Sequence, residues 1–272
     1  MTSQDLTGCT IAELFDQTLT HARIDPVLQS ENYWLYVRAL HFRSDRAIFD
    51  HAASLCSDTD PLMRAVGADI LAQLGTREEY PFADESAPVL ISLLGDIDSR
   101  VIASALYALG HLKRGESAEL IALAQHPSES IRCALAYALG GRSDDLSCSA
   151  LVILSADQDL DTRNWATFSL GSIGECDSTA IREALLARLS DSDDEVRGEA
   201  MVGLARRKDA RAVSAILTAL GNEHVLNLAI EAAEEMPRSE FLPHLEELLA
   251  KHPEDEDIQR AVEACRSAKN AT

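Results

Sequence analysis

Aromatic residues are scarce in this sequence, and long apolar runs are absent. Phe, Trp and Tyr make up 5% of the 272 residues, although apolar residues as a whole make up 46%. Alanine and leucine must therefore fill the interior, which favours closely packed helices over a sheet rich in valine and isoleucine. No apolar stretch approaches the roughly 18–20 residues that a membrane-spanning helix needs, and the first residues lack the features of a signal peptide. We therefore expect a cytoplasmic protein with no membrane contact.

Cysteine pairs with C-x-x-C spacing are also absent. Scattered cysteines in a chain without an export signal predict reduced, mostly buried thiols. The six are Cys9, Cys56, Cys133, Cys148, Cys176 and Cys265.

Positive charge is in short supply. The chain has 24 basic and 45 acidic residues, which gives a net charge of −21. Such a charge repels nucleic acid and anionic lipid, and it would attract a basic partner.

Catalytic motifs are missing as well. The eight histidines form no H-E-x-x-H motif, and the sequence has no phosphate-binding P-loop and no G-x-S-x-G nucleophile elbow. Cys133 is a conceivable nucleophile, but a buried cysteine is the commoner case. We therefore predict no catalytic residue, no metal site and no cofactor.

A recurring segment is the strongest positive signal. The motif from Thr162 to Gly171 returns in altered form, and its last positions fall at 75, 110, 140, 171, 205 and 234. Steps of roughly 30–35 residues are typical of a stacked repeat. The sequence predicts an all-α fold, a right-handed α-solenoid of about seven to eight antiparallel helix pairs.

Each repeat is predicted to hold two helices, A and B, with the motif on helix B. Acidic turns before the B helices supply capping oxygens and meet the positive end of the helix dipole. A glycine follows the motif leucine in four repeats, which favours a left-handed C-cap. The four are Gly75, Gly110, Gly140 and Gly171. The predicted A helices are Asp84–Leu94, Ser117–Gln125, Ser147–Leu154, Thr179–Leu189 and Ala212–Leu220.

The predicted organisation is one continuous domain with three parts. Residues 1–56 form N-terminal capping helices, residues 57–236 the repeat array, and residues 237–272 a capping helix pair and tail. The charged closing pair is predicted at Phe241–Leu249 and Glu256–Arg266, since a terminal repeat needs a polar outer face.

The chain resembles the HEAT-repeat proteins, specifically the short-repeat type also found in phycobilin lyases. The family pattern has Asp in the turn between the helices, followed by Val-Arg on helix B. Asp157 with Arg163 and Asp191 with Arg197 keep both residues, six positions apart. The resemblance implies that these side chains form a structural ladder of hydrogen bonds within and between repeats. An anion or peptide-carboxylate site at the same residues is the alternative.

Two known activities of such folds fit poorly. Deoxyhypusine hydroxylases bind iron through repeated His-Glu pairs, and this chain has no His-Glu dipeptide. Alkylpurine DNA glycosylases need a cationic groove for DNA, which the acidic charge opposes.

Aromatic residues recur three positions before the glycine in three consecutive repeats. They are Tyr107, Tyr137 and Phe168, and Trp165 lies one turn before Phe168 on the same face. If this face lines the concave groove, the stripe would anchor a partner, with Glu199 at its rim, because Tyr and Trp are typical interface hot spots. The alternative is that these rings fill gaps between neighbouring B helices.

A basic cluster follows the next motif. Arg206, Arg207 and Arg211 are candidates for an anion contact, against the default of a solvated turn that meets the helix C-terminus.

Taken together, the sequence predicts a non-catalytic scaffold or inhibitor that binds a basic protein, for example an immunity protein that blocks a cationic toxin. Two alternatives stay open. One is a bilin-lyase-like protein that holds a tetrapyrrole, and the other is a structural subunit of an oligomer.

Overall fold

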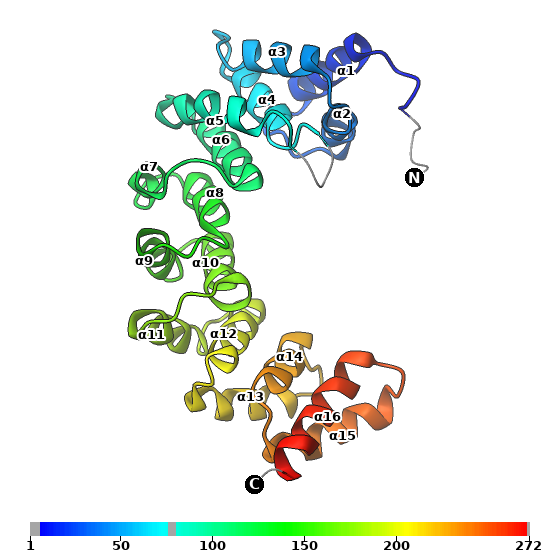
Figure 1. The fold of residues 1–272 in the computed structure, drawn as a ribbon, viewed down its shortest axis with the longest axis vertical. Coiled ribbons are helices and arrows are strands. Elements are labelled where there is room, and N and C mark those ends of the chain that lie inside the picture. Colours follow the sequence, from blue (N-terminus) through cyan, green and yellow to red (C-terminus); the bar gives the residue numbers. More distant parts are fainter. Residues whose placement is uncertain (1–5, 76–79, 271–272) are drawn as a thin grey trace. The chain divides into compact units, whose positions relative to one another are not determined.

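The computed structural model describes residues 6–75 and 80–270. Within these residues the chain contains sixteen α-helices and no strand (Figure 1), so the all-α prediction is confirmed. The helices form the α-solenoid that the repeat predicts. None of the helices in these two stretches is both long and apolar enough to cross a bilayer.

The helices follow one another as A and B members of successive pairs. The first eight are α1 (Ile11–Ile24), α2 (Glu31–His41), α3 (Arg46–Leu55), α4 (Pro61–Leu71), α5 (Ala83–Ser92), α6 (Ser99–Leu112), α7 (Ser117–Leu120) and α8 (Glu129–Leu139). The remaining eight are α9 (Asp145–Leu154), α10 (Leu160–Phe168), α11 (Thr179–Arg188), α12 (Asp194–Arg206), α13 (Val213–Leu220), α14 (Asn227–Glu235), α15 (Leu242–Lys251) and α16 (Glu256–Asn270). The predicted A helices correspond to α5, α7, α9, α11 and α13.

An Asp-x-Asp turn starts four of the B helices. In the turn before α10, the Asp157 carboxylate accepts a hydrogen bond from the Asp159 N–H, and the Asp159 carboxylate caps Thr162 N–H. The turns before α4, α6 and α12 repeat both contacts. Two backbone donors that the helix leaves unpaired are thus satisfied, and negative charge lies at the positive end of the dipole.

The chain divides by its internal contacts into two units, residues 1–138 and 139–272. In the first unit, α4 packs on α3 and α6, and in the second, α12 packs on α10, α11 and α14. The apolar motif positions form the core of each unit. Val66, Ile70, Val196 and Leu204, for example, are fully buried. The predicted three-part division of the chain stays a prediction.

The glycines after the motif leucine serve a different purpose from the predicted one. Of the four motif glycines, only Gly75 has a positive φ, of 135°. Gly110 lies inside α6, and Gly171 lies in the π-helical turn Ser169–Ile173. A Cβ on Gly171 would lie 2.5 Å from the Glu199 carbonyl oxygen, and one on Gly110 would lie 2.9 Å from the Cα of Ala138. The left-handed C-cap is therefore wrong for Gly110, Gly140 and Gly171, and at Gly110 and Gly171 glycine permits close approach of successive B helices.

Candidate functional site

Arg163 links two successive repeats. Its Nε and one terminal nitrogen donate to the two carboxylate oxygens of Asp191 at 3.0 and 3.2 Å. The other terminal nitrogen donates to the carbonyl oxygens of Asp157 and Gln158. Burial is the largest single effect on Asp191 and opposes its ionisation, but the hydrogen bonds from Arg163 and from the Asp193 N–H, together with the charges of Arg163 and Arg188, bring the pKa of the carboxyl below its usual range. We call such an arginine, with the contacts that it makes to the turns of two successive repeats, a rung of the ladder.

Arg64 makes the same contacts in the first unit. It forks onto the Asp96 carboxylate at 2.7 and 2.8 Å and donates to the carbonyl oxygens of Asp58 and Thr59. The sequence prediction missed this rung, although Asp58 and Arg64 have the same six-residue spacing as Asp157 and Arg163. The hydrogen bonds that the Asp96 carboxylate accepts from Arg64 are the main cause of its lowered pKa.

Arg197 departs from the pattern. It donates to the Asp191 carbonyl oxygen, as a rung arginine does, but its ion pair is with Asp194 in the first turn of its own helix. Asp157 likewise offers Arg163 its carbonyl oxygen and not its carboxylate. Arg163 was predicted to pair with the carboxylate of Asp157 in its own repeat. Its carboxylate partner is instead Asp191, in the next repeat.

The predicted aromatic residues fall into the two units. In the first, the Tyr107 and Tyr137 rings lie 5.3 Å apart, and both are half-buried. The Tyr137 hydroxyl lies 2.9 Å from His111 Nδ1, and His111 Nε2 lies 3.1 Å from the Gln73 amide nitrogen. These residues come from α6, α8 and the turn after α4, and they form an uncharged polar cluster.

In the second unit, Trp165 and Phe168 form an edge-to-face pair with centroids 5.8 Å apart. Trp165 is 37% exposed, although such rings are usually well buried. The Ser172 hydroxyl, one turn beyond Phe168, donates to the Glu199 carboxylate on α12. The pair therefore lies on a helix that packs on α12, the next B helix, which carries Glu195 and Glu199.

Those carboxylates crowd one another. Glu195 accepts a hydrogen bond from Asn164 on α10, and Glu199 is only 9% exposed. Burial, together with the charges of Glu231 and Glu195, raises the pKa of Glu199 despite the Ser172 hydrogen bond. Burial and the charge of Glu235 also raise the pKa of Glu231 on α14.

We call Trp165, Phe168, Glu195, Glu199 and Glu231 the acidic aromatic face. Like charges four residues apart on a helix, such as Glu195 and Glu199, destabilise that helix. The crowding of these carboxylates thus costs folding free energy that a cationic ligand would recover. Sequence reasoning placed Glu199 at the rim of the aromatic stripe, and the structure buries this side chain with a hydrogen bond from Ser172.

The three candidate anion-binding arginines have internal partners. Arg207 donates to the carbonyl oxygens of Leu170, Gly203 and Cys176, and burial lowers its pKa. Arg211 pairs with Asp209 and Glu183, and Arg206 donates to the Ser172 carbonyl oxygen. The contacts of Arg207 leave it little access to an anion, since its side chain is 7% exposed. For Arg206 and Arg211 an anion contact stays a prediction.

Two cysteines differ from the expectation of reduced thiols. Cys148 on α9 and Cys176, in the loop between the π-helical turn and α11, form a disulfide. Cys9, Cys56, Cys133 and Cys265 lie outside this disulfide.

A buried polar group lies in the core of the first unit. The Tyr33 hydroxyl donates to the Asp69 carboxylate at 2.8 Å, and His41 Nε2 lies 2.8 Å from the Asp69 carbonyl oxygen. Burial raises the pKa of Asp69 to about 6 and lowers that of His41 to about 4. These shifts concern stability, since burial keeps both groups away from any ligand.

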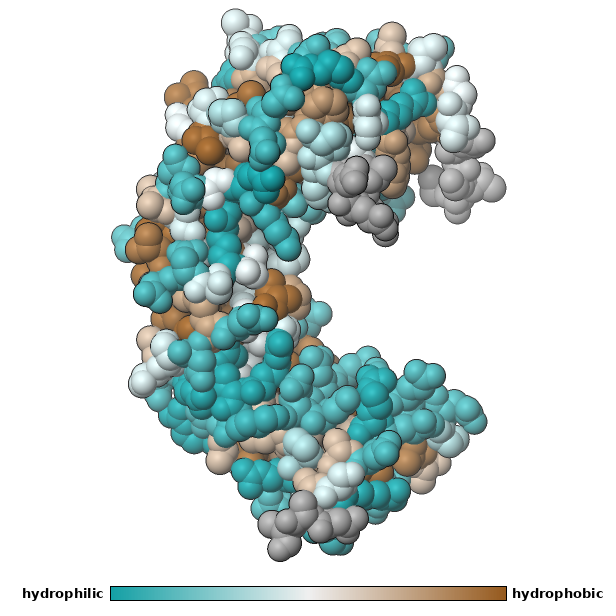
Figure 2. Space-filling view, in the orientation of Figure 1, coloured by the Kyte–Doolittle hydropathy of each residue, from teal (hydrophilic) through white to brown (hydrophobic). Residues whose placement is uncertain are grey.

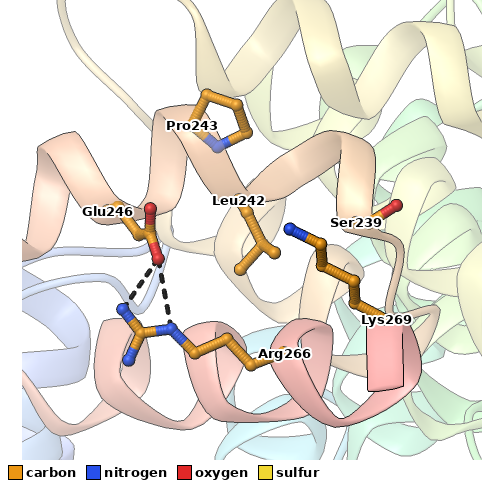
Figure 3. Close-up of a pocket in the computed structure, with 6 residues that line it drawn as sticks. All are labelled: Ser239, Leu242, Pro243, Glu246, Arg266 and Lys269. Carbon is orange, nitrogen blue, oxygen red and sulfur yellow. Dashed lines mark hydrogen bonds and ion pairs between the residues drawn. The ribbon is translucent and has the colours of Figure 1, made fainter. Parts of the chain in front are cut away.

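The closing helix pair forms a further pocket of about 450 Å³ between α15 and α16 (Figure 3). Glu246 bridges to Arg266 across it at 2.7 Å, and Lys269 points into it. Its lining mixes charges of both signs with Leu242 and Pro243. Nothing in this lining singles out a ligand.

Comparison with known proteins identifies the family. A profile for HEAT repeats matches residues 87–171 and 182–266, more than half of the chain. The chain belongs to the HEAT-repeat family. Protein YibA of Escherichia coli K12 is 30% identical over 237 residues, which cover 83% of this chain and 82% of YibA. YibA of strain O157:H7 matches over the same shares.

Solved structures agree with this fold. The X-ray structure of Escherichia coli YibA has a TM-score of 0.69 at 26% identity and covers 97% of this chain and 99% of its own. An engineered protein, with a TM-score of 0.60 at 20% identity over 96% of this chain and 85% of its own, shows the fold alone. A HEAT-repeat solenoid suits protein interaction and is typically not catalytic.

Proposed function

We propose that this HEAT-repeat protein is a non-catalytic, cytoplasmic scaffold or inhibitor that binds a basic protein through the acidic aromatic face. The single observation that carries the proposal is the exposed Trp165 on α10, which packs on α12 with its carboxylate Glu199, whose pKa is raised in part by the charges of Glu231 and Glu195. An aromatic anchor next to charged groups of one sign matches the composition of an interface hot spot and its surroundings.

Electrostatics supports a basic partner in particular. The net charge of −21 gives the chain a long-range attraction for cations. The face of the C-terminal helices that is visible in Figure 2 is predominantly hydrophilic. A partner lysine or arginine placed between Glu199 and Glu231 would relieve their repulsion, and its stem or guanidinium would pack on Trp165.

Affinity capture tests this proposal with charge-matched variants. The test variant is Glu195→Gln with Glu231→Gln, and the control is Glu223→Gln with Glu263→Gln, which removes the same charge at exposed positions elsewhere in the second unit. We expect wild type and control to retain the same basic protein, identified by mass spectrometry, and the test variant to lose it. Equal retention by both variants would place the site elsewhere or show that only overall charge matters.

An immunity protein for a cationic toxin is one specific version of this function. It predicts that the captured partner is toxic to cells that lack this chain. The tetrapyrrole alternative predicts instead a spectral change when a bilin is added to the purified protein, and no observation above favours it.

A further inference from the structure

The Cys148–Cys176 disulfide ties α9 to the loop that follows the π-helical turn. Cys148 is 7% exposed on α9, and Cys176 is half-buried in the loop between the π-helical turn and α11. In the sequence the two are 28 residues apart. The bond therefore closes a ring of chain that contains α10, Trp165 and the whole π-helical turn.

The same loop is held by two further groups. Arg207 donates from one terminal nitrogen to the carbonyl oxygens of Leu170 and Cys176, at 2.8 and 2.6 Å. Arg182 pairs with Asp177, the residue after Cys176, at 2.5 Å. The disulfide is the one link between this loop and α9 that a change of redox conditions can open.

The π-helical turn connects the disulfide-bonded loop to residues of the acidic aromatic face. A π-helical turn is a rare, strained departure from the α-helix and is frequent at functional sites. Its Ser172 hydroxyl donates to Glu199, and its Gly171 lies against the Glu199 backbone. Phe168, which precedes the turn, carries Trp165 at its ring edge. Movement of the loop would thus displace Ser172 and Phe168, both neighbours of binding residues.

We propose that the Cys148–Cys176 disulfide is a redox switch of the acidic aromatic face. The oxidised form holds the π-helical turn in the geometry that binds the basic partner, and reduction weakens that binding. This inference rests on the proposed function and adds its regulation. In a reducing compartment disulfides are typically transient and redox-sensing, which fits a switch.

The chemistry is a thiol–disulfide exchange. A dithiol reductant, of the thioredoxin or dithiothreitol class, attacks one sulfur as a thiolate and forms a mixed disulfide, and its second thiol then displaces the protein sulfur. Two electrons and two protons pass to the protein, which gains two thiols, and the reductant becomes a disulfide. Cys176 is the more exposed of the two sulfur-bearing residues and is the expected point of attack.

The direction of the effect follows from preorganisation. A loosened turn leaves Trp165 and Glu199 in several arrangements, and binding must then order them. We expect reduction to weaken binding roughly fivefold or more, the lower end of measured couplings between two sites.

The first experiment needs no partner. Maleimide labelling of the denatured protein should count four thiols after aerobic purification and six after dithiothreitol, because four of the six cysteines lie outside the disulfide. In a Trp34→Phe background, Trp165 is the sole tryptophan. Reduction should shift its emission to longer wavelength and speed amide hydrogen exchange in residues 169–177. Six thiols before reduction, or unchanged emission and exchange after it, would overturn the switch.

The second experiment measures binding of the captured partner by surface plasmon resonance in both redox states. We expect wild type and Cys9→Ser to lose affinity on reduction, and Cys148→Ser with Cys176→Ser to bind weakly in both states. Wild-type binding that is equal in both states overturns the switch but leaves the proposed function intact. If no partner binds in either state, the proposed function fails, while the thiol count and the exchange data still decide whether the redox change exists. The wild-type comparison needs no variant, so it stands even if the double variant fails to fold.

Discussion

Arg64 and Arg163 show how much a single side chain can do in this fold, since each guanidinium serves the turns of two repeats. The Asp191 side chain is 5% exposed and that of Arg163 is 13% exposed. Arg163→Ala would leave a buried carboxylate with the weaker support of Arg188 at 3.2 Å. We expect a loss of about 1–3 kcal/mol in the free energy of unfolding, measured by urea denaturation.

Arg64→Ala should cost a similar amount, because its contacts with Asp96 repeat the same geometry. Arg266→Ala is the matched control, since the side chains of its ion pair with Glu246 are 57% and 47% exposed and such pairs contribute about 0–1 kcal/mol. An Arg163→Ala midpoint no lower than that of Arg266→Ala would show that the Arg163–Asp191 pair is a solvated contact.

Asp69 and His41 should give opposing pH dependences of stability. Asp69 has a folded pKa of about 6, above the ordinary value of 3.8, so its contribution to stability is fully present below pH 3.8 and is lost as pH rises through 6. His41 has a folded pKa of about 4, below 6.5, so its contribution is present above 6.5 and is lost as pH falls through 4. The two largely cancel in wild type.

Single substitutions separate the two groups. Relative to wild type, Asp69→Asn should gain stability as pH rises from 4 to 6.5, by on the order of 2–3 kcal/mol for a shift of this size. His41→Gln should show the opposite trend over the same range. Urea unfolding at intervals of pH measures both, and parallel curves for the two variants would show that neither pKa shift exists.

At the scale of the helices, glycine sets how closely neighbouring B helices approach. Gly171 and Gly203 face each other from the π-helical turn and α12, with 2.6 Å between a Cβ on Gly203 and the Gly171 Cα. Gly171→Ala would push against the Glu199 carbonyl oxygen and should destabilise the chain by about 1–3 kcal/mol, the usual cost of overpacking. Thermal or urea unfolding checks this.

Gly95→Ala supplies the control for that substitution. Nothing lies within 4 Å of a Cβ added at Gly95, so the free energy of unfolding of this variant should differ little from that of wild type. If the two variants unfold alike, the close approach at Gly171 is not important for stability.

The helices themselves were predictable from the sequence, because their signals are local. The aspartates before α4, α6, α10 and α12 and the apolar stripe mark where each B helix begins and which side it buries. The ladder was predictable only in part. The Asp58 and Arg64 spacing was present in the sequence, but the offset to the carboxylate of the next repeat depends on how the repeats stack.

The remaining features depend on distant residues. Whether glycine ends a helix or admits a neighbour is decided by the backbone opposite, as Glu199 shows for Gly171. No spacing in the sequence marks Cys148 and Cys176 as partners, since they meet only after α9 and the loop before α11 are packed. Arg207 looked like a surface residue because the carbonyl groups that bind it come from a preceding repeat.

At the scale of the whole molecule, the net negative charge and the Trp165 ring should govern different steps of partner binding, association and dissociation respectively. Association should slow as salt rises, because the field of a chain with a net charge of −21 is screened beyond roughly 8 Å at physiological ionic strength. Trp165→Ala should instead speed dissociation, by a factor that corresponds to about 2 kcal/mol or more if the ring is a hot spot.

Surface plasmon kinetics of the captured partner at several salt concentrations separate the two effects. Trp34→Phe, at the other tryptophan of the chain, is the control and should leave both rates unchanged, since that side chain lies in the first unit and donates to the Leu28 carbonyl oxygen. Dissociation that Trp165→Ala leaves unchanged would remove Trp165 from the interface. Association that is insensitive to salt would argue against a basic partner, because carboxylates on exposed helices steer the encounter before any contact is made.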